Sequence, residues 1–340
     1  MSTKNLIIFC LIAVTAFIYK GCGGIDWNLD DRDSSWDTTI TIEDPELEWA
    51  IREALGLDTM TPITRKMALS LTFLNASYIE IKELKGIEYF TNLTELILDD
   101  NQISDIKPLE SLRNLEKLHI SNNQIHDISP LKSLSHLNKL YLDDNEIHDI
   151  SPLKSLSNLS WLDLSYNTIE NITPLGSLTN LAWVMLDYNK ISDITIFTIM
   201  PYLIRLEISY NRIRDLAPLA NLKNLSWLDL SHNNISDIHP LATLTHMKRL
   251  DLDDNYLYDI KPLENLTNLL ILNLRNNEIS DIYPLGNLIN LFGLDLSYNR
   301  ISDVTPLLNH TRLLELCLIY NTIDDTTGLE DFLDQDSCEN

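Results

Sequence analysis

The chain has 340 residues, of which 44% are hydrophobic and only 9 are glycine, so it can build a continuous apolar core. Its formal net charge of −25 argues against nucleic acid as a partner, because surfaces that bind nucleic acid are strongly basic. The same charge argues against an anionic membrane as a direct ligand, and it permits a partner with a basic surface without requiring one.

Residues 1–22 are predicted to be an export signal. One lysine, Lys4, precedes an uncharged apolar run from Leu6 to Tyr19, which is short for a membrane span and typical of a signal peptide. Cys22 follows this run and resembles the processing site of bacterial lipoproteins. By that resemblance Cys22 would carry a lipid that tethers the mature protein to a membrane without spanning it. Ordinary secretion, an uncleaved anchor and a cytosolic protein remain alternatives.

An acidic tether and a helical cap are predicted next. Residues 23–40 contain five aspartates without the spacing of a calcium loop, which indicates a flexible tether. Within residues 41–73, Asp44 is placed to cap a helix that begins with proline, and apolar residues then recur at helical spacing. A second short helix is predicted from Pro62 to Leu71. Together the two helices would cover the exposed end of the first repeat.

Eleven asparagines recur every 22 residues along the rest of the chain. They are Asn101, Asn123, Asn145, Asn167, Asn189, Asn211, Asn233, Asn255, Asn277, Asn299 and Asn321. The residues around them read L-x-x-L-x-L-x-x-N-x-I and then x-P-L-x-x-L, which is the leucine-rich repeat pattern. Residues 74–333 are therefore predicted to form an α/β solenoid with degenerate first and last turns, followed by an acidic tail at 334–340. Its expected shape is a horseshoe with a parallel concave β-sheet and short 3-10 or irregular convex returns.

Two polar columns are interpreted as structural. Each asparagine lies where the chain leaves a strand, and its amide can pair with backbone groups of a buried turn. An aspartate column, interrupted by Asn171, precedes the returns and can cap their tight helical turns. Ile196 replaces the proline expected in one return.

The concave face is predicted to hold the binding site. Side chains alternate along a strand, so the positions six, four, two and one before each asparagine should lie on this face. Aromatic and basic residues gather there in adjacent turns, and these residue types dominate binding energies. They are Trp161, Trp183, Trp227, Tyr166, Tyr188, Tyr210, Arg205 and Arg249. The alternative is that adjacent rings only stack on one another.

Carboxylates are expected between these columns, with Glu207, Asp229 and Asp251 on adjacent strands. Three like charges so close would be neutralised by the neighbouring arginines or by a raised pKa, would receive a basic partner, or would hold a cation. Neighbouring carboxylates also approach the spacing found in retaining glycosidases. An open sheet offers no closed pocket, however, so we predict no enzyme activity.

Other chemistry is sparse in the sequence. No cysteine and histidine cluster has metal-ligand spacing, so neither a metal nor a cofactor is predicted, and the eight histidines are expected to be exposed on the solenoid surface. Cys317 and Cys338 are 21 residues apart, almost one repeat. They could therefore form a disulfide at the open end of the array or remain free thiols.

The cap motif from Asp44 to Leu55, followed by turns that read N-x-I-x-D-I-x-P-L, resembles the cap and repeats of internalin-like bacterial surface proteins over about residues 41–333. This resemblance implies an extracellular binding module without catalysis. The chain departs from many such proteins after Asn321, where only a partial turn and the acidic tail follow. Binding of a host receptor is therefore not carried over.

We predict a non-enzymatic module for protein recognition or adhesion, exported to the cell envelope or surface and tethered through Cys22. A protein is the expected partner, and contact with a membrane is expected only through the lipid anchor. Two alternatives remain open. One is a carbohydrate-binding surface protein. The other is an intracellular regulator of a phosphatase or a similar enzyme, because phosphatase-regulating proteins use similar 22-residue repeats.

Overall fold

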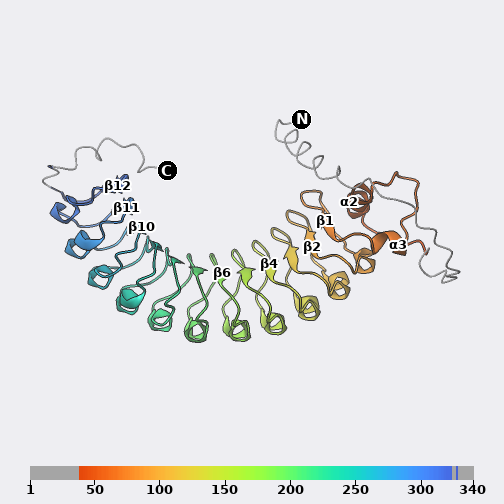
Figure 1. Ribbon diagram of the computed structural model, residues 1–340, viewed down its shortest axis with the longest axis horizontal. Helices are drawn as coiled ribbons and strands as arrows, with labels where there is room; N and C mark the ends of the chain where they lie inside the picture. Colours follow the sequence, from red (N-terminus) through yellow and green to blue (C-terminus); the bar gives the residue numbers. More distant parts are fainter. Residues whose placement is uncertain (1–37, 324–326, 328–340) are drawn as a thin grey trace, which may run out of the picture. The chain divides into compact units, whose positions relative to one another are not determined.

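The computed structural model describes residues 38–323 and 327. Within them the chain forms a curved solenoid, with the strands on its inner side and the helices of the returns on its outer side (Figure 1). The predicted leucine-rich repeat horseshoe is thereby confirmed. The predicted signal with Cys22, most of the tether and the tail with Cys338 lie outside the described residues. Among the described residues, no helix is long and apolar enough to cross a membrane.

The cap contains helices α2 (Pro45–Leu55) and α3 (Arg65–Ala68). As the sequence predicted, Asp44 caps α2, because its Oδ1 accepts hydrogen bonds from two backbone N–H groups of the first turn. Helix α3 is shorter than the predicted range. The reason is tertiary: Thr39 pairs with Thr64 in an antiparallel bridge, so the chain is extended up to Thr64 and turns helical only after it. Thr39 and the buried Ile40 thus belong to the cap although they were assigned to the tether.

Asp44 also joins the cap to the first repeat. Its Oδ2 accepts hydrogen bonds from Lys82 N at 2.8 Å and from Glu83 N at 3.2 Å. Burial raises the pKa of the Asp44 carboxyl, but four backbone N–H groups together lower it, and the net effect is a pKa below the ordinary value. The stabilisation from this carboxylate is therefore present above the ordinary aspartate pKa and is lost as the pH falls through the lowered one.

We expect Asp44→Ala to lower the free energy of unfolding by about 2–4 kcal/mol, because it leaves four N–H groups without their acceptor. Urea unfolding at neutral pH measures this loss. Asp58→Ala is the control, because Asp58 also accepts bonds from two backbone N–H groups but lies on the exposed surface of the cap. Equal losses in the two variants would contradict the linking role of Asp44.

The described residues form one twelve-stranded parallel sheet in which each strand pairs with the next along the chain. Each residue pairs with the one 22 positions later, as Leu96 does with Leu118, so equivalent side chains form columns across the sheet. The strands are β1 Phe73–Asn75, β2 Glu95–Ile97, β3 Lys117–His119, β4 Lys139–Tyr141, β5 Trp161–Asp163, β6 Trp183–Met185, β7 Arg205–Glu207, β8 Trp227–Asp229, β9 Arg249–Asp251, β10 Ile271–Asn273, β11 Gly293–Asp295 and β12 Glu315–Cys317.

The returns are 3-10 helices, as predicted. They are η1 Ile87–Tyr89, η2 Lys107–Ser111, η3 Ser129–Ser133, η4 Ser151–Ser155, η5 Thr173–Ser177, η6 Thr195–Ile199, η7 Ala217–Leu219, η8 His239–Thr243, η9 Lys261–Leu263, η10 Tyr283–Asn287 and η11 Thr305–Leu307. Asp105 Oδ1 accepts from Lys107 N at 2.8 Å, and Asn171 takes the same role in its turn. Ile196 is accommodated by Gly176 of the preceding turn, where an added Cβ would lie only 2.5 Å from its Cδ1.

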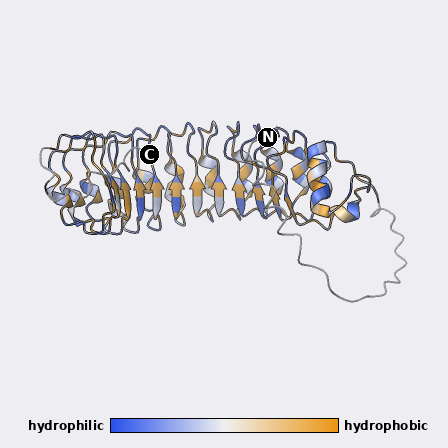
Figure 2. Ribbon diagram, turned by 90° about the horizontal axis from the view of Figure 1, so that it is seen from above, coloured by the Kyte–Doolittle hydropathy of each residue, from blue (hydrophilic) through white to orange (hydrophobic). Residues whose placement is uncertain are grey.

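The core is a column of leucine and isoleucine side chains between the sheet and the returns, most of them fully buried. Figure 2 shows the hydrophobic residues repeating along the row of strands and the hydrophilic residues between them. The predicted structural role of the asparagines is confirmed: Asn189 Nδ2 donates to three backbone carbonyls, and its Oδ1 accepts from Ile169 N at 2.9 Å.

Three histidines differ from the expectation that all of them are exposed: His119 and His232 are half-buried, and His310 lies in the core. His310 is only 4% exposed, because it takes a core position that leucine fills in most other turns. Its Nε2 lies 3.1 Å from the carbonyl oxygen of Leu285, which gives the buried ring a polar partner. Burial lowers the pKa of His310, so the neutral imidazole is favoured in the core.

Candidate functional site

The first column of the candidate site is a stacked ladder of aromatic and basic side chains, called here the tryptophan ladder. It consists of Lys139, Trp161, Trp183, Arg205, Trp227 and Arg249, the first residues of strands β4 to β9. The rings of Trp161 and Trp183 are stacked with centroids 4.5 Å apart. The Arg205 guanidinium lies between Trp183 and Trp227, at 5.4 Å and 3.6 Å from their centroids.

The two ends of the tryptophan ladder are also closed by cations. Arg249 lies 4.5 Å from the Trp227 centroid, and Lys139 Nζ lies 5.5 Å from the Trp161 centroid. Cation–π contacts of this kind attract because the ring faces are electron-rich. The ladder therefore crosses six adjacent strands without interruption, and all three predicted tryptophans belong to it.

A second column, called here the tyrosine ladder, follows the ends of the strands. It consists of Tyr166, Tyr188, Tyr210 and His232, whose successive ring centroids are 4.2, 3.9 and 3.8 Å apart. All four residues have a left-handed backbone with φ between 50° and 54°. This conformation interrupts the alternation of an extended strand, and the three tyrosines remain 37–51% exposed.

Stacking of adjacent rings, the predicted alternative to a binding role, is thus present in both ladders. Stacking does not remove the candidate site, because the tryptophans are only half-buried and the tyrosines are exposed. Stacking orders the rings before binding, so these side chains would lose little additional conformational entropy when a partner contacts them. The predicted aromatic patch is therefore a prearranged surface, and its role in binding stays a prediction.

The predicted carboxylates Glu207, Asp229 and Asp251 lie on strands β7, β8 and β9 in register. Arg205 Nε donates to Glu207 Oε1 at 2.6 Å, so this arginine neutralises one of the three charges. Burial, and then repulsion from Asp229, raise the pKa of Asp251 to about 6. Neutralisation by arginine and a raised pKa therefore both occur in this column.

The position two before the asparagines was predicted to lie on the concave face, but its aspartates Asp187 and Asp253 were not among the predicted site residues. Burial is the main cause that raises the pKa of each of these carboxyls to about 7. Asp187 remains perturbed although Ser209 donates to it from both its backbone N–H and its hydroxyl. The aspartates could have been found by comparing the residues at this repeat position, as was done for the adjacent positions. Their burial could not be predicted from the spacing.

Raised aspartate pKa values predict an unusual pH dependence of stability. The folded protein holds the Asp187 proton up to about pH 7, whereas the unfolded chain releases it near the ordinary value of 3.8. Stability therefore falls as the pH rises through this window. We expect Asp187 alone to lower the free energy of unfolding by about 2 kcal/mol between about pH 5.5 and 8, measured by urea unfolding of the wild type and Asp187→Asn across this range. Asp187→Asn should reduce this slope, and an unchanged slope in the variant would contradict the assignment.

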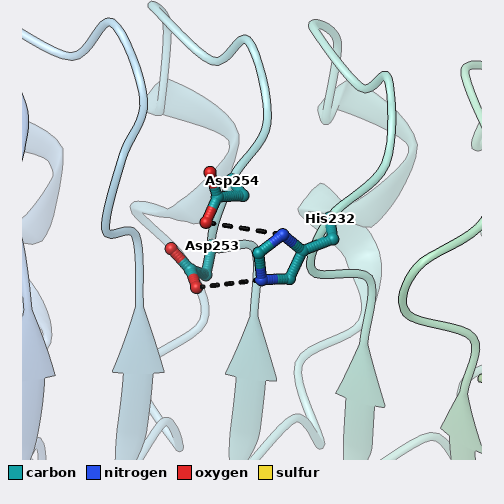
Figure 3. A group of neighbouring side chains, drawn as sticks. All are labelled: His232, Asp253 and Asp254. Atoms are coloured by element: carbon teal, nitrogen blue, oxygen red, sulfur yellow. Dashed lines mark ion pairs between the residues drawn. The ribbon is translucent and has the colours of Figure 1, made fainter.

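One group among the described residues has the composition of a cation site. His232 Nδ1 lies 3.5 Å from Asp254 Oδ2, and His232 Nε2 lies 3.6 Å from Asp253 Oδ2 (Figure 3). The sequence predicted no metal, because these ligands come from two adjacent turns and match no local metal motif. Cys317 lies on β12 and is disulfide-bonded, while its suggested partner Cys338 lies outside the described residues.

Comparisons with known proteins agree on the repeats. A family model described as leucine-rich repeats (2 copies) matches residues 113–155 and 223–265. Two further models, each described as a leucine-rich repeat, match residues 135–191 and 179–235, and residues 91–106. A search of curated proteins finds no significant match.

Solved structures give the strongest similarities. The chain is 35% identical to an internalin (InlF) of Listeria monocytogenes, with a TM-score of 0.60 over 80% of this chain and 94% of that one. It is 36% identical to internalin C2 of the same species, with a TM-score of 0.59 over 63% of this chain and 93% of that one. The leucine-rich repeat protein LIC12759 of Leptospira interrogans is 24% identical, with a TM-score of 0.68 over 76% and 75%, and shares the fold.

Proposed function

The chain belongs to the internalin family of leucine-rich repeat proteins, and we propose that it is a non-enzymatic recognition module that binds a protein through its concave face. The observation that carries this proposal is the pair of stacked ladders on adjacent strands. At about 4.8 Å per strand, the tryptophan ladder extends over roughly 24 Å, which suits the centre of a protein interface.

The residue types and their order both support binding. Tryptophan, tyrosine and arginine contribute most of the energy in protein interfaces, and they do so best where the side chains are rigid. In this surface each ring is held by its neighbours in the ladder, and Arg205 is held by Glu207 as well as by two tryptophans. The binding groups are therefore positioned before a partner arrives.

The charge of the surface indicates the chemistry of the partner. Asp163, Glu207, Asp229 and Asp251 lie beside the tryptophan ladder, and the whole chain carries a net charge of −25. Glu207 is already paired with Arg205, so a partner with basic side chains would neutralise Asp163, Asp229 and Asp251 and approach faster through electrostatic attraction. We therefore propose a protein with a basic surface.

The geometry of the tryptophans disfavours the carbohydrate alternative. Sugars stack on the flat face of an aromatic ring, which must be open for that contact. Trp183 has one face against Trp161 and the other towards Arg205, and Trp227 lies between Arg205 and Arg249. These rings offer edges rather than faces to a ligand, and edges suit the side chains of a protein partner.

We also propose export and lipid tethering through Cys22, on the basis of the N-terminal sequence. Mass spectrometry of the N-terminus of the native protein tests this proposal. A lipidated N-terminal Cys22 would support it and would remove the alternative of an intracellular regulator. An intact Met1 without lipid would overturn it.

The binding proposal is tested by pull-down from host and bacterial envelope extracts. The full wild-type chain is compared with a variant in which Trp161, Trp183 and Trp227 are all replaced by alanine. A protein retained by the wild type and not by the variant would support recognition by the concave face and would identify the partner. Retention of the same proteins by both baits would overturn it.

A further inference from the structure

We propose that His232, Asp253 and Asp254 bind one divalent first-row transition-metal cation, such as Zn²⁺. The three residues follow strands β8 and β9 on adjacent turns, and Figure 3 shows the imidazole facing both carboxylates. The proposal concerns a ligand of this chain itself, so it does not depend on the proposed protein partner.

The two carboxylates face different ring nitrogens, Asp254 at 3.5 Å from Nδ1 and Asp253 at 3.6 Å from Nε2, and both distances exceed those of ordinary hydrogen bonds. A single ion would therefore use one of the two nitrogens. One ligand atom from each residue can be chosen so that all three lie within 4.8 Å of one another. Zinc bonds to nitrogen and oxygen are about 2.0–2.2 Å long, so the ligand atoms would have to close by roughly 1 Å or less. Rotation of the side chains can supply that movement.

The backbone and the neighbouring turns hold these groups in place. His232 N donates to the carbonyl oxygen of Asp253 at 2.8 Å, which fixes the register of the two turns. The Tyr210 ring stacks on the imidazole at 3.8 Å. Asn276 donates to Asp254 Oδ1, which leaves Oδ2 for a cation. Supporting contacts of this kind orient the ligands of known metal sites.

An independent observation points to a missing positive partner. Asp253 Oδ1 is buried, and no donor among the described residues is within hydrogen-bond distance of it. A buried carboxylate oxygen without a partner is costly. The nearby carboxylates of Asp254 and Asp251 add to the negative charge, and the charge of Arg275, whose guanidinium lies 4.5 Å from the Tyr298 ring centroid, offsets only part of it. A cation bound to the Asp253 carboxylate would offset this cost.

The array contains a natural comparison for this site. Asn122, Asp143 and Asp144 occupy the same repeat positions as His232, Asp253 and Asp254, with asparagine in place of histidine. Both asparagine and histidine have the left-handed backbone, with φ of 50° and 51°. The groups differ in the imidazole and in one hydrogen bond, because the Ser121 hydroxyl donates to Asp143 Oδ1 whereas Asp253 Oδ1 has no partner within the described part of the chain. An imidazole nitrogen with two carboxylates favours zinc and its first-row neighbours over calcium or magnesium, and a three-ligand site leaves room for water or an external ligand.

The test is isothermal titration of the purified, untagged full chain with zinc chloride at neutral pH. We expect one tight equivalent of zinc in the wild type. His232→Tyr keeps a ring that can stack on Tyr210 and removes both nitrogens, so it should lose this equivalent. Asp254→Asn should weaken it by about 10-fold or more. Asp144→Asn is the matched control and should bind zinc as the wild type does.

Circular dichroism and thermal melting of each variant show whether its fold is intact. Cobalt(II) absorption then identifies the ligands, because cysteine thiolates give intense charge-transfer bands and nitrogen or oxygen ligands give only weak visible bands. Weak bands in the wild type that disappear in folded His232→Tyr would support the site. Undiminished zinc binding in folded His232→Tyr, or no zinc equivalent in the wild type, would overturn it.

Discussion

Asn189→Ala is expected to lower the free energy of unfolding by about 3–6 kcal/mol. The Asn189 amide makes four hydrogen bonds: Nδ2 donates to the carbonyl oxygens of Leu164, Leu186 and Asp187, and Oδ1 accepts from Ile169 N. Alanine would leave these backbone groups without their partner in a turn where water has little access. Each orphaned buried group costs about 1–3 kcal/mol, although the costs are not additive.

The effect should also spread along the array, because each asparagine joins its own turn to the preceding one. Urea unfolding followed by circular dichroism measures the loss. Asn180→Ala is the matched control, since Asn180 lies in the same turn, is exposed and donates one hydrogen bond, to Ser157 O at 2.9 Å. It should lose less than about 1 kcal/mol. Similar losses of unfolding free energy in both variants would show that the buried asparagines do not stabilise the turns more than an exposed asparagine does.

Trp183→Ala combined with Tyr188→Ala is expected to weaken binding of the partner at least about 100-fold, or about 2.7 kcal/mol. The double variant removes the middle of both ladders, because Trp183 lies between Trp161 and Arg205, and Tyr188 lies between Tyr166 and Tyr210. Truncating either ring also frees its neighbours, so the partner would have to order them on binding. Titration calorimetry with the protein recovered in the pull-down measures the change.

The matched control for this prediction is Tyr298→Ala combined with Tyr320→Ala. These tyrosines occupy the same repeat position as Tyr188 and stack on each other at 4.3 Å, but they lie near the far end of the array. The control loses one stacked pair, which costs about 0.5–1.5 kcal/mol, and the Trp183 and Tyr188 double variant loses three stacked pairs and the Arg205 contact. Circular dichroism therefore checks that both double variants are folded before their affinities are compared. Equal affinities of the two folded variants would show that the centre of the ladders does not bind the partner.

The repeat made much of this fold predictable. Because Leu96 and Leu118 pair with a separation of one repeat, a 22-residue period defines both the parallel register and the columns of side chains on the sheet. The roles of Asn189 and Asp105 followed from the same logic, since a turn repeated many times presents the same unpaired backbone groups each time. The candidate binding residues were found because they depart from this repetition.

The prediction was less accurate for the cap, which precedes the regular repeats. The residues around Pro62 read as a helix, but pairing of Thr39 with Thr64 keeps that segment extended, and α3 starts only at Arg65. This contact joins residues 25 positions apart outside the repeated array, so no periodicity could indicate it.

The 22-residue period is sufficient to specify the solenoid, the order of its strands and the residue types on its concave face, because a regular repeat carries that information. Three properties came from the folded structure: which ring faces are covered, how far burial raises the Asp187 pKa, and the contact of His232 with Asp253 and Asp254. These properties depend on rotamers, exclusion of water and contacts between adjacent turns. The surroundings of a residue set these properties, and the position of the residue in a repeat does not specify them.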